Sequence, residues 1–281
     1  MNIYDIAKLA NVSIATVSRV VNNSPKVSPK TKEKVLAVMK ENEYTPNAFA
    51  RGLGLGSMKT VGIICPNIDD IYMAKAVSYL ERNLHAHGYD CILGCSGFKQ
   101  EEKEDYVRLL LSKKIDTLIL VGSTYAGNGK DESDTDYIRE AAEQVSIFMI
   151  NAKVSGDNIY CTYADDFQAT YEVTKAFIRR GKEKILFMYD SESYSARQKM
   201  AGYEAALQEA GYPICGNLKF KTRNDIEYTR DMLLEYNRTL DFDSVLATED
   251  GIAIGAVKYA KIKELAIPEE LPVAGYNNSI L

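Results

Sequence analysis

The chain has 281 residues, of which 46% are apolar and 26% charged, a composition typical of a globular protein with two or three domains. No apolar run approaches the roughly 18 residues needed to cross a bilayer, so the sequence excludes a transmembrane helix. The N-terminal residues lack a basic stretch followed by an unbroken apolar one, the pattern of a secretory signal. We therefore expect a cytoplasmic protein with no membrane partner.

The net charge of −5 conceals a difference between two parts of the chain. Residues 1–59 contain nine Lys or Arg against four acidic residues, a balance of +5. The remainder contains 25 basic and 35 acidic residues, a balance of −10. A basic head on an acidic body is expected where only the head touches a polyanion.

The cysteines give no sign of a disulfide framework or a metal site. They are odd in number and contain no CxxC pair: Cys65, Cys91, Cys95, Cys161 and Cys215. This usage favours reduced thiols in a cytoplasm. Cys91 and Cys95 lie in a segment with the pattern of a strand, where we expect no bond between them.

Three short helices are predicted in the basic head. Apolar residues recur at helical spacing over residues 3–10, and Asn11 then interrupts them, because asparagine tolerates the left-handed conformation of a tight turn. Ser13 can cap a second helix, and Ser28 followed by Pro29 is a favourable start for a third. The second helix should pack inward through Ala15, Val17, Val20 and Val21. Two helices joined by a tight turn indicate a helix-turn-helix unit.

From residue 61 the pattern changes to alternating strands and helices. Strands are predicted at 60–65, 90–95, 116–122, 184–189, 217–221, 243–250 and 271–276, and helices at 72–87, 100–113, 195–210, 226–239 and 251–264. Two successive α/β halves of similar size indicate two doubly wound subdomains that face each other across a cleft. Ligands of such sheets bind at the carboxyl ends of the strands, so we expect a site there.

With these elements placed, the chain resembles the lactose-repressor (LacI-type) family of bacterial transcription regulators. The segments "IYDIAKLANVSIATVSRVVNN" and "VSPKTKEKVLAVMKENEYTPNAFARGL" are similar to that family's head almost position by position, and the resemblance covers residues 2–281. Asn11 stands where the family usually has glycine. Family members normally continue well beyond the last predicted strand, so we expect this chain to be a truncated product or a fragment.

The resemblance implies an all-α head and a body like that of periplasmic binding proteins, incomplete at its C-terminal end. Residues 1–58 would form the helix-turn-helix domain, with a hinge helix at about 47–54. Residues 59–281 would form the effector-binding domain, with an N-subdomain at about 59–157 and a C-subdomain at about 158–281.

The resemblance further implies that the second helix enters the major groove of double-stranded operator DNA with its N-terminal residues at base edges. Arg19 can then pair with guanine, which contributes about 1–3 kcal/mol of discrimination. Ile14 and Ala15 favour thymine methyl groups. The implied DNA-contacting residues of the head are Tyr4, Ser13, Ile14, Ala15, Thr16, Ser18, Arg19 and Asn22. The alternative is an ordinary surface helix whose hydroxyl groups are solvated.

The segment "NAFARGLGLG" is similar to the family's hinge helix, which folds when DNA is bound. Its implied DNA contacts are Asn47, Ala50 and Leu53. Leu53 would pair with its counterpart in the dimer as a wedge in the minor groove. The three glycines between 52 and 56 each cost about 1 kcal/mol relative to alanine in a helix, so the free segment should be disordered. A flexible linker without DNA contacts is the alternative.

Five residues of the body match effector-binding positions of the family: Tyr72, Asp165, Arg197, Asp250 and Asn277. A guanidinium can bond two sugar hydroxyls at once, and carboxylates and amides beside an aromatic wall suit a neutral polyhydroxyl ligand, for which a sugar is expected. Asn277 stands where aspartate is usual. A surface or capping role is the alternative for each of the five.

The expected function is therefore transcription regulation by a homodimeric repressor on a pseudo-palindromic operator. A small molecule that closes the two subdomains would move the hinges and change DNA affinity, an allosteric coupling. No cofactor, metal or catalytic residue is expected, because no histidine stands beside a candidate nucleophile and no metal-ligand cluster is present. A periplasmic-type sugar-binding protein shares the body, but the basic head argues against it.

Overall fold

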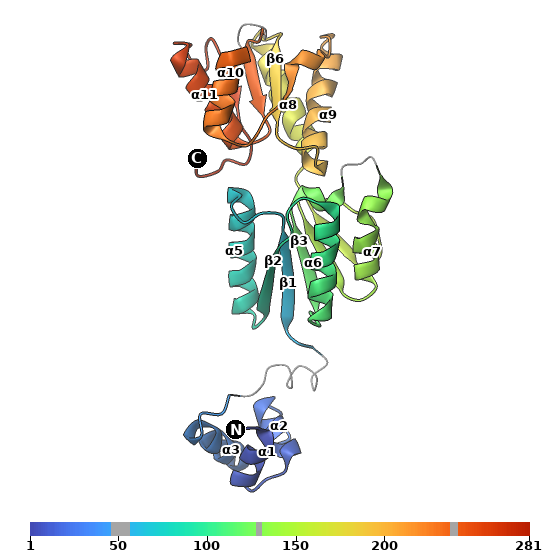
Figure 1. Cartoon of the computed structure of the whole chain (residues 1–281), viewed down its shortest axis with the longest axis vertical. Coiled ribbons are helices and arrows are strands. Elements are labelled where there is room, and N and C mark those ends of the chain that lie inside the picture. The colour runs from blue at the N-terminus through green and yellow to red at the C-terminus, as the bar shows by residue number, and fades with distance from the viewer. Residues whose placement is uncertain (46–56, 128–130, 237–240) are drawn as a thin grey trace.

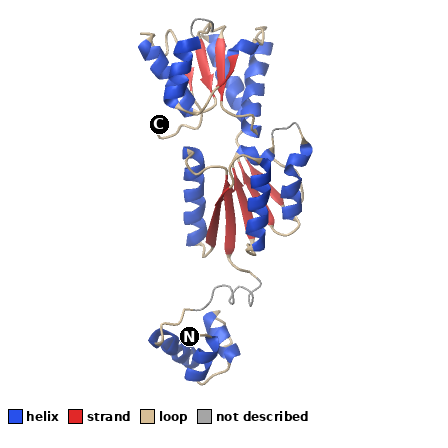
Figure 2. Ribbon diagram, viewed as in Figure 1, coloured by secondary structure: helices blue, strands red, loops and turns tan. Residues whose placement is uncertain are grey.

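The computed structural model describes residues 1–45, 57–127, 131–236 and 241–281. These residues form a helical head and two subdomains that each contain a parallel sheet (Figure 1). Figure 2 shows helices on the outside of both sheets. No helix within the described ranges is long and apolar enough to span a membrane.

The head consists of α1 (Ile3–Leu9), α2 (Ile14–Val21) and α3 (Pro29–Glu41), as predicted. Their shared core contains Ile6, Val17 and Val35, whose side chains are fully buried. Ser13 caps α2 and Ser28 caps α3, where the hydroxyl of each accepts a hydrogen bond from the backbone three residues on. These caps satisfy backbone donors that a helix N-terminus otherwise leaves unpaired.

The turn between α1 and α2 has the conformation that the sequence indicates. Asn11 has a φ of 48°, in the left-handed region. Asparagine enters this region at lower cost than most non-glycine residues, because its short side chain can bond locally. The prediction for the inward face of α2 is wrong at one position. Ala15 is exposed, whereas Val17 and Val20 are buried, because the helix turns its first residues away from the core.

The first subdomain contains a five-stranded parallel sheet in the order β2-β1-β3-β4-β5. Its elements are β1 (Thr60–Cys65), α5 (Ile71–Ala86), β2 (Asp90–Cys95), α6 (Gln100–Ser112), β3 (Thr117–Val121), α7 (Asp136–Ala142), β4 (Ser146–Ile150) and β5 (Ile159–Thr162). Helix α5 covers one face of the sheet, and α6 and α7 cover the other. The strands β1 and β3 are buried on both faces, which explains their continuous apolar sequences.

The second subdomain has a four-stranded parallel sheet in the order β7-β6-β8-β9. Its elements are α8 (Asp166–Arg179), β6 (Ile185–Tyr189), α9 (Tyr194–Glu209), β7 (Lys219–Lys221), α10 (Ile226–Tyr236), β8 (Ser244–Ala247), α11 (Asp250–Ile262) and β9 (Val273–Ala274). Helices α8 and α9 pack on one face, and α10 and α11 pack on the other. Both subdomains are therefore doubly wound, as predicted.

Two features of the body differ from expectation. The predicted subdomain boundary between residues 157 and 158 falls before β5, but β5 pairs with β4 and belongs to the first sheet. The assignment of β5 to the first subdomain depends on its pairing with β4, which the local sequence does not indicate. The sequence patterns also missed α7, β4, β5 and α8. All five cysteines are free, as expected for Cys91 and Cys95 in β2.

Candidate DNA-binding surface and ligand cavity

Helix α2 presents an exposed face that combines a cation with small apolar groups. Arg19 and Ala15 are exposed, and Ile14 is 42% exposed. The opposite face, with Val17 and Val20, is buried in the head. Arg19 therefore projects away from the core, which is the orientation that base contact in a major groove requires.

The hydroxyl groups of Ser13 and Thr16, near the start of α2, form a hydrogen bond with each other. Ser13 Oγ accepts a hydrogen bond from the Thr16 backbone nitrogen at 3.1 Å and lies 2.8 Å from Thr16 Oγ1. This cap fixes the end of the helix that would meet the bases. Ser18 and Asn22 are half-buried, whereas Tyr4 on α1 is 66% exposed. The predicted hinge contacts Asn47, Ala50 and Leu53 lie outside the described residues.

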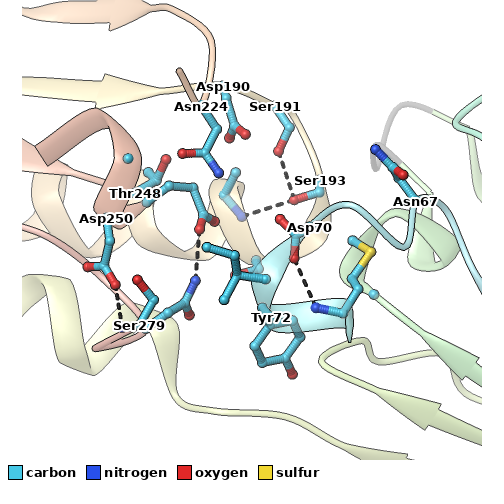
Figure 3. Close-up of a pocket in the computed structure, with 18 of the residues that line it drawn as sticks. Asn67, Asp70, Tyr72, Asp190, Ser191, Ser193, Asn224, Thr248, Asp250 and Ser279 are labelled. Atoms are coloured by element: carbon cyan, nitrogen blue, oxygen red, sulfur yellow. Dashed lines mark hydrogen bonds between the residues drawn. The ribbon is translucent and has the colours of Figure 1, made fainter. Parts of the chain in front are cut away.

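A cavity of about 710 Å³ lies between the two subdomains. Its walls are the loops that follow the carboxyl ends of β1, β3, β6 and β8 and the first turns of α5, α9 and α11. Figure 3 shows that the side chains from these segments converge. Gly122, which follows β3, has a φ of 124°, and an added Cβ would lie 3.3 Å from Met73 and Pro66, so this wall depends on glycine.

The structure brings three of the five predicted effector residues into the cavity lining: Tyr72, Asp250 and Asn277. Asp250 Oδ2 accepts a hydrogen bond from the Ser279 backbone nitrogen at 2.6 Å, which ties the loop after β9 to the start of α11. Asn277 Nδ2 donates to Glu249 Oε2 at 2.8 Å. These side chains offer carboxylate, amide and phenol groups to a polar ligand (Figure 3).

The other two predicted effector residues are not among the lining residues. Asp165 caps α8, where its carboxylate accepts a hydrogen bond from the Gln168 backbone nitrogen at 2.9 Å. Arg197 Nη1 lies 3.4 Å from the carbonyl oxygens of Gly127 and Glu192, at the edge where the subdomains meet. The sequence position alone could not reveal these backbone partners.

The sequence patterns did not identify Lys199, a buried cation in the cavity lining. Lys199 is 3% exposed, and its Nζ donates to the Thr248 carbonyl at 3.0 Å, lies 3.9 Å from Glu249 Oε1 and lies 3.7 Å from the centre of the Tyr276 ring. Burial lowers the pKa of Lys199, and the neighbouring carboxylates oppose that shift. Lysine residues on helices are usually exposed to solvent, so nothing in the local sequence indicates that Lys199 is buried.

Sequence reasoning also left Asp70, Asp190 and Glu249 out of the site. Each has a positional signal: Asp190 and Glu249 come shortly after buried strands, and Asp70 caps α5 through a 2.9 Å bond from the Met73 backbone nitrogen. Burial raises the pKa of Asp190 and raises that of Glu249 to about 7. For Glu249, Lys199 opposes this shift, and Asp190, Asp70 and Asp250 add to it.

The raised pKa of Glu249 predicts a pH-dependent stability. Between the ordinary value of 4.5 and about 7, the folded state holds a proton on Glu249 that the unfolded state has released. This contribution to the free energy of unfolding is therefore complete below pH 4.5 and is lost as the pH rises through 7. In urea titrations across this window, Glu249→Gln should lose less stability with rising pH than the wild type. Parallel profiles for the two proteins would contradict this assignment.

Comparison with known proteins gives two family matches that together cover both parts of the chain. Residues 2–47 match the model described as "Bacterial regulatory proteins, lacI family". Residues 58–278 match "Periplasmic binding proteins and sugar binding domain of LacI family". The second match alone would also fit a periplasmic binding protein, but the first matches the helical head.

Two relatives are similar over the whole chain. An HTH-type transcriptional regulator of Lachnoclostridium phytofermentans is 47% identical over 282 residues, which cover 100% of this chain and 84% of that protein. The catabolite control protein A of Priestia megaterium is 30% identical over 289 residues, which cover 100% of this chain and 83% of that protein. These relatives are transcription regulators, in agreement with the prediction of a non-enzymatic protein.

Solved structures share the fold. The lac repressor dimer bound to operator and the anti-inducer ONPF has a TM-score of 0.86 at 22% identity, with 100% of this chain and 83% of that chain covered. A complex of the transcriptional regulator CelR with cellobiose has a TM-score of 0.65 at 23% identity, with 99% and 83% covered. The chain belongs to the lacI family of bacterial regulatory proteins, with a DNA-binding head and a body of the periplasmic-binding-protein type.

Proposed function

We propose that this protein is a cytoplasmic transcription repressor that binds a pseudo-palindromic operator as a homodimer and changes its affinity when a small molecule occupies the cavity. Residues 1–58 would bind DNA, and residues 59–281 would bind the effector and the second subunit. The observation that carries the proposal is the outward projection of Arg19 from α2 on a separately folded basic head.

The cavity supports the effector part of the proposal. Its lining contains carboxylate, amide and hydroxyl groups beside the phenol of Tyr72, which suit the hydroxyl groups of a sugar. A ligand held by both subdomains would bind the closed arrangement more tightly than the open one. This difference in affinity would shift the equilibrium between the open and closed arrangements toward the closed one. A neighbour in fold, CelR, was solved with cellobiose, which agrees with a sugar as the expected ligand.

The test is selection of DNA from a random duplex library, followed by titration of the selected sequence. We expect a site with two half-sites related by a two-fold axis, because a symmetric dimer presents two identical heads. A sugar panel added to the preformed complex should then change the fraction bound. Failure to enrich any sequence over random DNA would overturn the proposal.

Leu53→Ala should weaken binding to the selected operator about tenfold and leave binding to random DNA nearly unchanged. The reason is that a wedge acts only where it unstacks a base step, and this gain is confined to the specific complex. Fluorescence anisotropy at one fixed salt concentration measures both affinities. Leu36→Ala, an exposed leucine on α3, is the matched control. If the affinities for the operator and for random DNA fall by the same factor, Leu53 has no role in specific recognition.

A further inference from the structure

The cavity lining carries more negative than positive charge. Its acidic residues are Asp69, Asp70, Asp190, Asp225, Glu227, Glu249 and Asp250, and its basic residues are Lys75 and Lys199. Glu227 forms ion pairs with Arg230 and Lys258, so it is compensated from outside the cavity. The other six acids outnumber Lys75 and Lys199, so the cleft carries a net negative charge.

Three of these carboxylates lie on opposite walls of the cavity. Asp70 belongs to the first subdomain, at the start of α5, whereas Asp190 and Glu249 follow β6 and β8 of the second. The negative charge of Asp70 adds to the rise in the pKa of both Asp190 and Glu249. Like charges on opposite walls oppose closure, because closure shortens the distances between them.

The lysine beneath this cluster does not fill the space between the walls. Lys199 is committed to the Thr248 carbonyl, the Glu249 carboxylate and the Tyr276 ring, and its side chain is almost fully buried. Arg197, the cation expected from sequence, is bonded to Gly127 and Glu192 carbonyls instead of the lining. Of the two lysines in the lining, Lys199 is therefore engaged and Lys75 is an exposed residue of α5, so we expect a positive charge between the walls to come from the ligand.

Two buried hydroxyl groups of the same lining also lack partners within the described structure. Ser195 and Thr248 are 4% and 2% exposed, and neither Ser195 Oγ nor Thr248 Oγ1 has a hydrogen-bond partner among the described residues. A buried hydroxyl without a partner is unfavourable, and a polar ligand that reached either group would supply the missing hydrogen bond. The described residues contain no group of His, Cys, Asp or Glu arranged to hold a metal ion, so the geometry favours an organic cation.

We propose that the molecule recognised in this cavity carries a protonated amine, held between Asp70 of one subdomain and Asp190 and Glu249 of the other. The proposal rests on the proposed effector function and names the chemistry of its ligand. The amine would form charge-assisted hydrogen bonds to both walls and remove the repulsion that opposes closure. A neutral ligand of the same shape would leave that repulsion in place.

The experiment compares matched ligands by isothermal titration calorimetry on the full chain, at a pH where the amines are protonated. One series pairs glucosamine with glucose and N-acetylglucosamine, and galactosamine with galactose. A second series pairs putrescine with 1,4-butanediol. We expect at least one amine to bind about tenfold or more tightly than its neutral partner, as one charge-assisted hydrogen bond would give. The series that contains this amine identifies the source as an amino sugar or a linear amine.

The preference should fall to near unity in Asp70→Asn, Asp190→Asn and Glu249→Gln. Glu81→Gln makes the same charge change at an exposed position of α5 outside the cavity and should keep the preference. The inference is overturned if no amine binds, or if every neutral partner binds as tightly as its amine. If a neutral sugar changes operator affinity and binds as tightly as its amine, this inference alone is wrong. If the wild type shows no specific operator binding, the proposed function is wrong.

Discussion

Arg19→Ala should weaken binding to the selected operator by about 10- to 100-fold, with a much smaller loss on random DNA. A bidentate arginine–guanine pair contributes about 1–3 kcal/mol of discrimination. The exposed position of Arg19 on α2 means that its removal leaves the head core of Ile6, Val17 and Val35 untouched. Anisotropy titrations on both DNAs, with circular dichroism to verify folding, measure the effect.

Arg19→Lys separates recognition from charge. Lysine keeps the positive charge, so the dependence of log K on log salt should stay close to that of the wild type. It lacks the planar fork that bonds two acceptors of one guanine, so most of the specific loss should remain. Lys34→Ala, at an exposed position of α3, is the control for a charge outside α2. If Arg19→Lys restores full operator affinity, Arg19 acts as a phosphate contact and does not read a base.

Lys199→Met should lower the free energy of unfolding by about 3 kcal/mol near neutral pH, the scale expected when one partner of a buried ion pair is removed. Methionine keeps the length and flexibility of the side chain. It removes the cation that lies 3.9 Å from Glu249 Oε1 and donates to the Thr248 carbonyl. Urea denaturation followed by circular dichroism measures the loss.

The loss should be larger at pH 8 than at pH 6. The pKa of Glu249 is about 7, so at the lower pH a larger fraction of this carboxyl is protonated and needs no compensating charge. The double change Lys199→Met with Glu249→Gln should recover part of the stability, because it removes both charges. Lys75→Met, at an exposed lysine of the same lining, should cost little. A loss from Lys75→Met as large as that from Lys199→Met would show that packing, and not charge, explains the effect.

The head was predictable because its signals are local. Ser13 and Ser28 mark helix starts through bonds to residues three positions away, and Asn11 marks a turn through its own backbone preference. The strands β1 and β3 were also predictable from sequence, because a strand buried on both faces is continuously apolar. Ala15 was misplaced in the core because helical spacing alone does not decide how far an apolar stripe extends.

The sequence by itself therefore determined the two-part organisation, the capped helices, the alternation of strands and helices and the ends of strands where a ligand would bind. These follow from interactions within a few residues of each other. Only the tertiary structure assigned β5 to the first sheet, held Asp165 and Arg197 away from the cavity lining and placed Lys199 beneath Glu249 and Tyr276. These outcomes depend on partners far apart in the chain, whose burial and mutual charge exist only once the two subdomains are folded and face each other.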